Sequence, residues 1–529
     1  MYNNGDSTSA GVYTGEKDNS ISAKGIPTSI AGTVAPLKRG DVMVPYYTTQ
    51  TDELTSVFGP ADLSLSYMHH CMHPVLKETA AYIVRVAKNA KYGGIRVQTV
   101  NNYSKCVALS SGFADPQALD FQAEDIMIVY AANPGEWNNG LRINVYPDTS
   151  DSSGDQFIIQ VFEGTSQVAV ATYRGTNFEK KNGFNKQLFI EDVVAKSKYI
   201  RVKVNTEHPA LKNLDRNLVN AVSTGSFIGG HDGDEVTTGD LMEAWELLED
   251  PEELDVNLLV ECGMGSRDVA LQQQMLSIAQ KRDDCFAILD VPSDMQTAQD
   301  AVNFRRNQLN VSTSYGALFT PDVLISDPYS DDQFYVPPSG DIAASFAKSD
   351  NDYGIQYAAA GVVRGQLSRV LGLAQTYRLP HRDLLADNQI NPIRSISGGG
   401  LCTWGVDTLQ TYRSALSDIP VRRMISHLKV VIARAAMTGV YEPNDDSLRL
   451  ELRNIADGYL RPFLSRGLSR FEIVCDERNN TNEMIAAGDL MLDVYIWPTY
   501  VTRQIHLTAI VPKTGQIQFA IDQNYSAAA

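Results

Sequence analysis

Val256-Asn257-Leu258-Leu259-Val260 is a short apolar run of the kind that forms a strand buried on both faces. A second such run follows at Cys285-Phe286-Ala287-Ile288-Leu289-Asp290-Val291, and the stretch between them, Val269 to Ala279, has the apolar spacing of a helix. Strand, helix and strand in this order predict a βαβ unit with a parallel pair of strands. A strand at 321–326 and a helix near 339–347 are expected to extend this layer.

Residues 100 to 220, upstream of this layer, show the two-residue period of half-buried strands. Alternating segments separated by turn residues occur at Leu141–Tyr146, Phe157–Phe162, Val168–Tyr173 and Tyr199–Val204. Several short strands in such an order are typical of a β-sandwich. This region is therefore predicted to be an all-β insert, and the turn Gly229-Gly230-His231-Asp232-Gly233 separates it from the α/β layer.

Further elements are predicted on both sides of these two regions. They are a strand at 28–34, a helix ending at Gly59, a helix from about Tyr67 to Tyr82, a strand at 81–86, helices at 404–416 and 422–437, and strands at 471–475, 490–497 and 504–510. Together these elements predict an α+β protein with several domains.

Each end of the chain contains a strand-forming segment without a local partner. The first residues are rich in Asn, Gly, Ser, Thr and Asp, and only Gly11-Val12-Tyr13-Thr14-Gly15 is typical of a strand. Beyond Pro512, one isolated strand is predicted at 516–521. Because a lone strand is not stable, both segments are expected to pair with an edge supplied from elsewhere.

Length and composition limit the classes of protein. A chain of 529 residues is too long for one core, so about two to four domains are expected. The formal charge of −18 has the wrong sign for a phosphate backbone, and direct nucleic-acid binding is not expected. No apolar run is long enough for a membrane helix and the first residues are too polar for a signal peptide, so assembly in a cytoplasm is expected. The six cysteines include no CxxC pair, which favours reduced, mostly buried thiols.

The last quarter of the chain carries five motifs in a fixed order. They are Asn391-Pro392-Ile393-Arg394, Thr403-Trp404-Gly405, Val421-Arg422-Arg423, Tyr441-Glu442-Pro443-Asn444-Asp445 and Cys475-Asp476-Glu477-Arg478-Asn479-Asn480-Thr481. Together with Asn133–Leu141, Gly229–Gly233 and Arg282–Pro292, they resemble the contractile tail sheath proteins of bacteriophages and related injection machines. The chain departs from the family pattern in lacking a Pro before Gly11 and in having Tyr441 where Phe is commoner.

The resemblance implies an α+β multidomain fold, with a discontinuous α/β core sheath domain, an inserted β-sandwich, a subtilisin-like α/β layer and extended arms at both ends. The implied division is 1–24 N-terminal arm, 25–97 first part of the core sheath domain, 98–222 β-sandwich insert, 223–400 subtilisin-like α/β domain, 401–511 C-terminal core sheath domain and 512–529 C-terminal arm.

The resemblance also implies a structural subunit that is not an enzyme and holds no cofactor. Six subunits would form a ring, and rings would stack around an inner tail tube and contract to drive it through the host envelope. The implied partners are copies of the chain itself, the tube protein, and baseplate and neck or terminator proteins, in a virion tail assembled in the host cytoplasm without membrane insertion. The arms would add strands to neighbouring subunits through Val12, Tyr13, Ile517, Phe519 and Ile521.

The predicted helix from Arg422 to Met437 concentrates positive charge in an acidic chain. Between Arg422 and Arg470 there are nine basic and five acidic residues, a balance of +4. Because the family lines the interior of its rings with the C-terminal domain, this helix is expected to face the tube. The tube-facing residues would be Arg422, Arg423, Lys429 and Arg434, and the alternative interpretation is a solvated helix face.

Two other functions stay open at this level, a hydrolase built on the subtilisin-like layer and the sheath of a non-phage injection machine. A serine triad needs a carboxylate, an imidazole and a nucleophilic hydroxyl, and Asp290 or Asp232 with His231 could supply the first two. His231 lies in a Gly-Asp-Gly turn, however, where a solvated loop role is simpler. A structural layer without catalysis is therefore favoured.

Two clusters resemble metal sites. In His69-His70-Cys71-Met72-His73, His69 and His73 would share one helix face at the spacing of two zinc ligands, but further ligands would have to come from elsewhere. A solvated or interface helix is favoured. Asp232, Asp234 and Glu235 resemble part of a calcium loop without its full pattern, so turn chemistry is favoured and no metal is predicted.

Overall fold

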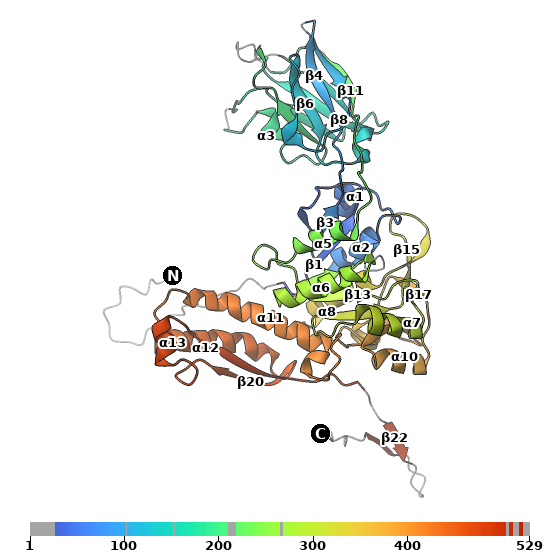
Figure 1. Ribbon diagram of the computed structural model, residues 1–529, viewed down its shortest axis with the longest axis vertical. Coiled ribbons are helices and arrows are strands. Elements are labelled where there is room, and N and C mark those ends of the chain that lie inside the picture. Colours follow the sequence, from blue (N-terminus) through green and yellow to red (C-terminus); the bar gives the residue numbers. More distant parts are fainter. Residues whose placement is uncertain are drawn as a thin grey trace, which may run out of the picture.

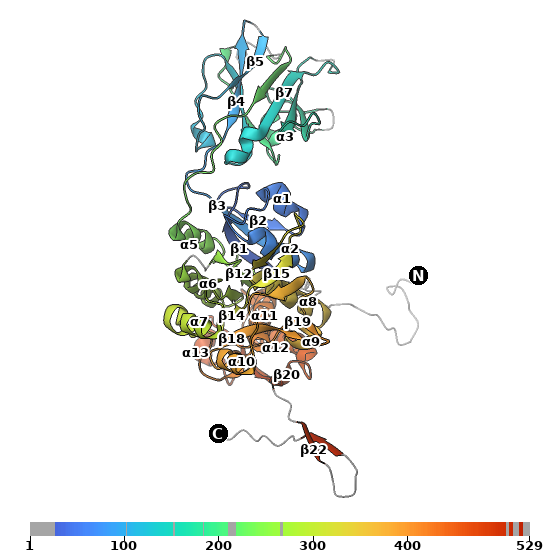
Figure 2. The ribbon, with the colours of Figure 1, turned by 90° about the vertical axis from the view of Figure 1, so that its right-hand side faces the viewer.

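The computed structural model describes residues 27–101, 103–151, 154–182, 185–209, 218–264 and 268–503, and the backbone of 507–510 and 518–521. Figures 1 and 2 show an elongated molecule with three parts. We name them the β-sandwich (94–226), the α/β body (31–86 with 238–403) and the C-terminal layer (419–498). None of the described helices is long and apolar enough to cross a membrane. All six cysteines are free, and all except Cys106 are buried, as predicted.

The α/β body is built on an eight-stranded sheet. In spatial order its strands are β19 (Gly400–Thr403), β18 (Ile390–Ile396), β14 (Gly316–Thr320), β13 (Phe286–Asp290), β12 (Leu258–Val260), β1 (Ala31–Pro36), β3 (Ala81–Val86) and β2 (Pro45–Thr48). The inner strands are parallel, and β2 and β19 at the edges run antiparallel to their neighbours. The predicted βαβ unit is confirmed, because β12 and β13 pair in parallel and are joined by α6 (Val269–Arg282).

Helices cover both faces of this sheet, as buried parallel strands require. On one face lie α1 (Asp52–Phe58), α2 (Met68–Glu78) and α8 (Ser339–Asp352). On the other face lie α5 (Thr238–Glu246), α6, α7 (Ala298–Asn303), the π-helical turn η4 (Phe304–Leu309) and α10 (Leu379–Ala386). Local sequence sets where these helices begin: Asp268 caps α6 through the N–H of Ala270, and Thr237 and Asp240 form a capping box at α5.

The strand predicted at 321–326 is present as β15 (Val323–Ser326), but it does not extend the parallel layer. It pairs with β16 (Gln333–Val336) and β17 (Val370–Leu373) in a separate antiparallel sheet. The short helix α9 (Gly361–Arg364) precedes β17 in the chain. The layer is extended instead by β14 and β18, which were not predicted from the sequence.

The segment 31–86 packs within the α/β body, whereas the sequence predicted that residues 25–97 share a core with 401–511. β1 lies between β3 and β12, with Ala31 opposite both Ala81 and Leu258. Every residue of β1 is buried, and a strand buried on both faces needs a helix on each side. α2 and α5 supply these helices, so the first segment packs within the α/β body.

The β-sandwich consists of two antiparallel sheets of four strands each. One has the order β10 (Ile200–Val204), β6 (Asp125–Ala131), β4 (Gly94–Val100), β5 (Tyr103–Ala108), and the other β11 (Ser223–Ser226), β7 (Leu141–Pro147), β8 (Phe157–Glu163), β9 (Ala171–Gly175). Alternate residues of the strands enter one shared apolar cluster, which α3 (Ile190–Val194) also covers. β9 begins later than predicted because Val168 belongs to the preceding turn and is 75% exposed.

The C-terminal layer contains α11 (Ile419–Ala436), α12 (Asp446–Leu460), α13 (Asn482–Ala487) and the two-stranded sheet of β20 (Leu468–Val474) and β21 (Asp493–Pro498). Its helices and sheet share an apolar cluster of their own, which includes Met424 and Leu428 of α11 and Ala456 and Leu460 of α12. The predicted helix at 422–437 and the strands at 471–475 and 490–497 are therefore present, with shifted ends.

The helix predicted at 404–416 is wrong. Asn391 accepts the N–H of Asp407 and donates to its carbonyl, both at 2.8 Å, so these backbone groups are not free for helical bonds. Gly405 packs so closely on Asn391 that a Cβ there would lie 2.3 Å from its Oδ1. Only a short turn, η5 (Ala415–Ser417), is helical, which shows that a tertiary contact overrides the local pattern.

The sequence predicted an isolated C-terminal strand, and this prediction is wrong because the strand forms a hairpin. β22 (Leu507–Ile510) and β23 (Gln518–Ile521) pair antiparallel, with Leu507 opposite Ile521. The strand predicted at 504–510 thus pairs with the next segment of the chain and not with the C-terminal layer. The hairpin stands away from the rest of the molecule in both views (Figures 1 and 2).

Candidate assembly surfaces

α11 joins the C-terminal layer to the α/β body. It begins after Asp418 with Pro420 in its first turn, where a missing N–H breaks no helical bond. Its apolar stripe, which includes Met424 and Leu428, packs toward α12 and β20. Its basic residues are directed at the body, because all of those predicted to face a tube are paired with body carboxylates.

Arg423 is 6% exposed and forms a buried ion pair with Asp350 of α8. Its Nη1 donates to Oδ1 at 3.1 Å and its Nη2 to Oδ2 at 2.5 Å. Nη2 also donates to the carbonyl of Thr28 at 3.3 Å, and the hydroxyl of Ser29 donates to Asp350 at 2.7 Å. The guanidinium lies 4.8 Å from the ring centroid of Phe346. This cluster therefore connects α11, α8 and the residues just before β1.

Arg422 and Lys429 approach a second body carboxylate, Asp283, at the end of α6. Arg422 is also buried; it lies 3.9 Å from Asp283 and 4.5 Å from the ring centroid of Tyr315, and it donates to the hydroxyl of Ser426 at 3.0 Å. Lys429 forms an ion pair with the same carboxylate. Asp283 therefore receives cationic groups from two positions that lie about two turns apart on α11.

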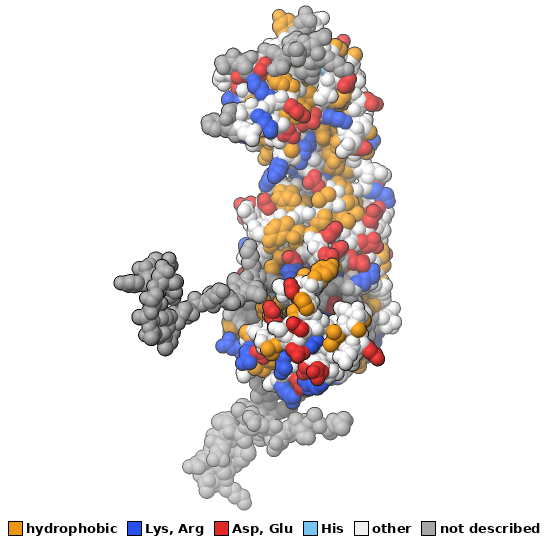
Figure 3. Space-filling model, turned by 90° about the vertical axis from the view of Figure 1, so that its left-hand side faces the viewer, with side chains coloured by type: hydrophobic (Ala, Val, Ile, Leu, Met, Phe, Trp, Pro, Cys, Tyr) orange, Lys and Arg blue, Asp and Glu red, His pale blue; other side chains and the backbone are white. Residues whose placement is uncertain are grey.

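Arg434 pairs with Asp255, and these two side chains are 39% and 47% exposed. The exposed basic face expected of this helix is therefore wrong for the two arginines at its start, which are buried. The partners, Asp255, Asp283 and Asp350, lie outside the window of 422–470 in which the balance of +4 was counted. On the face shown in Figure 3, acidic and basic side chains are interspersed over the C-terminal layer. A tube-facing role for Lys429 and Arg434 stays a prediction.

The sheet of β20 and β21 is open. Within the described residues neither strand has a second strand beside it. Aromatic side chains are exposed on and after β21: Tyr495 is 53%, Trp497 41% and Tyr500 68% exposed. The guanidinium of Arg470 lies 4.6 Å from the ring centroid of Trp497. An open strand edge beside exposed aromatic residues is a surface that a strand from another chain can complete.

The hairpin is the second candidate assembly element. In the described part of the chain, β22 and β23 pair only with each other, so each has an outer edge. Of the residues predicted for strand exchange, Val12, Tyr13 and Ile517 lie outside the described residues. Phe519 and Ile521 lie on β23, where only the backbone is described.

The structure does not assemble the catalytic triad considered above. Asp290, at the end of β13, accepts the N–H of Ser339 at 2.8 Å, and burial next to Glu261 raises the pKa of its carboxyl well above the usual range. His231 lies in the connection to the β-sandwich, where its Nδ1 accepts the N–H of Gly233 at 2.9 Å. Ser166 of the sequence Gly164-Thr165-Ser166, a candidate for the nucleophilic hydroxyl, lies in a turn of the β-sandwich. These groups therefore have structural roles in different parts of the molecule.

The histidine cluster on α2 is buried rather than solvated. Nε2 of His69 bonds to two backbone carbonyls at 3.0 Å, and Nε2 of His70 bonds to Asp327 at 3.1 Å. The ring of Tyr329 lies edge-on to His69, His70 and His73. No group of three possible metal ligands occurs among the residues that the structure describes. These histidines fill the packing between α2 and the loop after β15.

The acidic turn at 232–235 also has structural partners. Asp232 accepts the backbone N–H of Glu136 at 2.6 Å, and Asp234 accepts from the side chain of Asn89 at 2.6 Å. Both bonds reach residues far away in the sequence, so they attach the turn to neighbouring segments and are not local Asx bonds. The local turn chemistry predicted for these residues therefore stays a prediction.

Known proteins match this chain over most of its length. The family described as phage tail sheath protein central domain matches residues 234–408. The tail sheath protein of Enterobacteria phage T4 is 27% identical over 451 residues, which cover 75% of this chain and 67% of the relative. The tail sheath protein of Vibrio phage KVP40 is 29% identical over 313 residues, which cover 55% of this chain and only 46% of the relative.

Solved structures show the same fold. The sheath tail protein of Listeria innocua has a TM-score of 0.59 at 11% identity and covers 89% of this chain and 95% of its own. A chain of the anti-feeding prophage baseplate in the contracted state has a TM-score of 0.54 at 15% identity and covers 97% and 99%. The mixed α/β multidomain fold is thus that of tail sheath proteins. The family model, the two sequence relatives and the ordered motifs thus make this chain similar to phage tail sheath proteins, which are structural subunits of contractile tails and not enzymes.

Proposed function

We propose that this protein polymerises as stacked hexameric rings around an inner tail tube and contracts to drive that tube through the host envelope. The observation that carries the proposal is the presence, in one chain, of an open two-stranded sheet and a projecting hairpin. Similarity to tail sheath proteins supports the sheath role, and the separate structural hydrogen bonds of the buried Asp290 and the exposed His231 give the hydrolase alternative no support.

Strand addition is the proposed link between subunits. A strand of the β22–β23 hairpin that docks on the edge of β20 or β21 in a neighbouring subunit would continue that sheet through backbone hydrogen bonds. β23 has four residues, so a few bonds at about 1 kcal/mol net each would form. The N-terminal arm, with Val12 and Tyr13, is proposed to act in the same way.

Such links would persist while the larger surfaces between subunits rearrange. The extended sheath would be held by a kinetic barrier and not by its equilibrium stability, and a trigger at the baseplate would release it. The globular parts can then move as rigid units while the arms absorb the change in geometry.

We also propose the finer division of the fold. The parallel strands β12, β13 and β14 between two layers of helices support a subtilisin-like layer within 223–400. The closed β-sandwich supports a peripheral insert at 98–222. The arms at 1–24 and 512–529 and two further segments complete the proposed division: 25–97, most of which packs within the α/β body, and 401–511, which includes the C-terminal layer.

The proposed partners are copies of this chain, the inner tube protein and the baseplate and neck or terminator proteins, in a tail assembled in the host cytoplasm. Lys429 and Arg434 are proposed to touch the tube, because both stay partly exposed although paired. Exchange of both for Glu should weaken co-assembly with purified tube, most clearly at low salt. Unchanged binding at low salt would remove these residues from the tube contact.

The test of the assembly itself compares two truncations by negative-stain electron microscopy. Deletion of residues 504–529 removes both hairpin strands and should leave a folded monomer that forms no long tubes. Deletion of 522–529 ends the chain just after β23, and the shortened protein should still polymerise. Striated tubes from the protein that lacks 504–529 would contradict the role of the hairpin, and absence of rings and tubes from the full chain would contradict the proposed function.

A further inference from the structure

The β-sandwich is joined to the α/β body by a narrow neck (Figures 1 and 2). Two segments cross it, 87–93 and 227–237, and they pair as an antiparallel ribbon. The N–H of Lys91 donates to the carbonyl of His231 at 2.9 Å, with the reverse bond at 3.2 Å. A two-stranded ribbon is only marginally stable by itself. The ribbon alone therefore does not fix the orientation of the β-sandwich.

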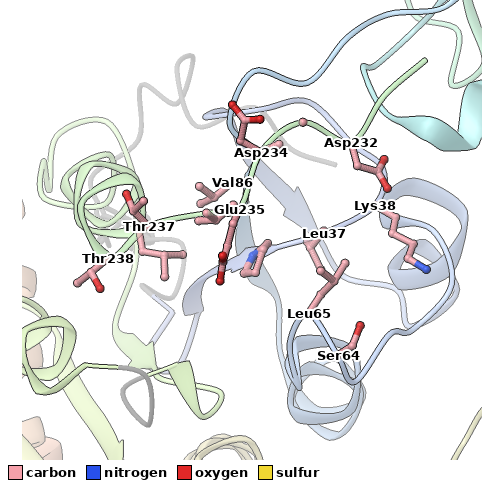
Figure 4. Close-up of a pocket in the computed structure, with 15 residues that line it drawn as sticks. Leu37, Lys38, Ser64, Leu65, Val86, Asp232, Asp234, Glu235, Thr237 and Thr238 are labelled. Atoms are coloured by element: carbon pink, nitrogen blue, oxygen red, sulfur yellow. The ribbon is translucent and has the colours of Figure 1, made fainter. Parts of the chain in front are cut away.

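Side-chain packing leaves one side of the neck open. Figure 4 shows a groove there, with a volume of about 960 Å³. It is lined on the body side by residues such as Leu37 and Leu65 and on the neck side by the turn 232–238. Because this space is not filled, packing on this side does not prevent the β-sandwich from tilting toward the body.

Arg85, at the end of β3, bonds to backbone from both parts. It is fully buried, and its guanidinium donates to the carbonyls of Leu37 at 2.7 Å, Lys38 at 3.1 Å and Gly40 at 2.7 Å. A fourth bond, at 2.8 Å, goes to the carbonyl of Pro134 in the β-sandwich. The planar fork of an arginine can make four such bonds at once, which a lysine ammonium cannot.

Arg39 projects in the opposite direction, from the body into the β-sandwich. Its side chain is 9% exposed, and it donates to the carbonyl of Lys198 at 2.9 Å and to Glu163 at 3.3 Å. The guanidinium lies 4.0 Å from the ring centroid of Trp137 and 5.1 Å from that of Tyr199. All four of these partners belong to the β-sandwich.

We propose that Arg39 and Arg85 lock the β-sandwich to the α/β body, so that a domain on a narrow neck moves with the body as one rigid piece. The ribbon, the Arg85 bond to Pro134 and the Arg39 pocket attach the two parts at separate points, and together they fix an orientation that two strands leave free. Two further contacts join the same parts, a hydrogen bond from Asn133 to Asp41 and an ion pair of Lys198 with Glu53. The proposal concerns a single subunit and can fail without affecting the proposed assembly.

The test uses spin labels at Val168→Cys on the β-sandwich and Lys348→Cys on α8, two exposed positions, in a Cys106→Ala background. Pulsed electron paramagnetic resonance then gives the distribution of distances between the two parts. The parent should give one narrow distance. Arg39→Ala should lose it and give a broad distribution, and the amide of Lys91 should exchange about ten- to a hundredfold faster, as expected when hydrogen bonds to a charged donor are lost.

Arg142→Ala is the matched control. Arg142 also donates to two carbonyls, at 3.0 and 2.7 Å, and lies 5.7 Å from the ring centroid of Phe162, but all its partners are within the β-sandwich. This variant should keep the narrow distance. An unchanged narrow distribution in folded Arg39→Ala and in the double variant Arg39→Ala with Arg85→Met would overturn the proposal. If the double variant does not fold, Arg39→Ala decides the question alone.

Discussion

Replacement of Arg423 by Ala is expected to weaken strongly the attachment of α11 to the α/β body. The residue is 6% exposed and the side chain of its partner, Asp350, is 1% exposed. Without the guanidinium, the buried carboxylate would keep the hydroxyl of Ser29 as a donor but lose both charged bonds. Removal of one member of a buried ion pair costs about 3–5 kcal/mol. This is a large part of the roughly 5–15 kcal/mol that stabilises a folded protein.

Arg434→Ala is the matched control, because Arg434 lies on the same helix and also pairs with a body carboxylate. Its side chain is 39% exposed and that of Asp255 is 47% exposed, so solvent screens this pair. Its loss should cost at most about 1 kcal/mol. A second control replaces both members of the buried pair, Arg423→Met with Asp350→Leu. An apolar pair of similar size should be close to neutral, because no charge is left without a partner.

Urea unfolding and hydrogen exchange of the α11 amides would measure these differences. Exchange is needed because a chain with several domains does not unfold in one step. The expected order of protection for the α11 amides is wild type, then Arg434→Ala and the double variant, then Arg423→Ala. Equal losses for Arg423→Ala and Arg434→Ala would refute the reasoning, and so would a double variant as unstable as Arg423→Ala.

Two further predictions concern the α/β body. The free energy of unfolding should fall by about 3 kcal/mol between pH 6.5 and 4 through His69, because burial lowers its pKa to about 4 and the unfolded chain takes up the proton first. Asp322 changes the free energy of unfolding in the opposite direction over this range, because burial raises its pKa to about 6. The measurement is therefore the difference in unfolding free energy between wild type and His69→Gln at each pH. Identical pH curves for the two proteins would contradict the prediction. Gly340→Ala should cost about 1–3 kcal/mol, since a Cβ would lie 2.2 Å from the carbonyl oxygen of Cys71 on α2. Gly239→Ala, at the same position of α5 but with no atom nearer than 3.8 Å, should be neutral or slightly stabilising, and equal thermal midpoints would show that α8 shifts to accept the methyl group.

Much of the fold can be predicted where the pattern is local. The apolar runs at 256–260 and 285–291 and the helix between them identify the parallel layer, because such runs have the length of buried strands and are too short for helices. The two-residue period identifies the β-sandwich in the same way. The amphipathic stripe identifies α11 and the side of it that packs on α12.

The candidate assembly residues were harder to predict because their partners are distant in the sequence. Arg423 meets Asp350, and the sequence around α11 holds no sign of that carboxylate. The helix predicted at 404–416 is wrong for the same reason, because the distant Asn391 forms hydrogen bonds with the backbone N–H and carbonyl of Asp407. The hairpin was missed because β22 and β23 were assigned to different parts of the chain, although only the segment 511–517 separates them.

Several arginines of this chain act as internal connections rather than as surface charges. Besides Arg39, Arg85 and Arg423, the buried Arg282 donates to four backbone carbonyls between α5 and β12. Arginine suits this use because it stays charged when buried and has five donors. As many acidic as basic side chains are buried, seven of each among the described residues, so the surface keeps the acidic excess behind the net charge of −18. Copies with this net charge are expected to repel one another at low salt. The proposed backbone pairing between arms and open sheet edges does not depend on charge and would join them despite that repulsion.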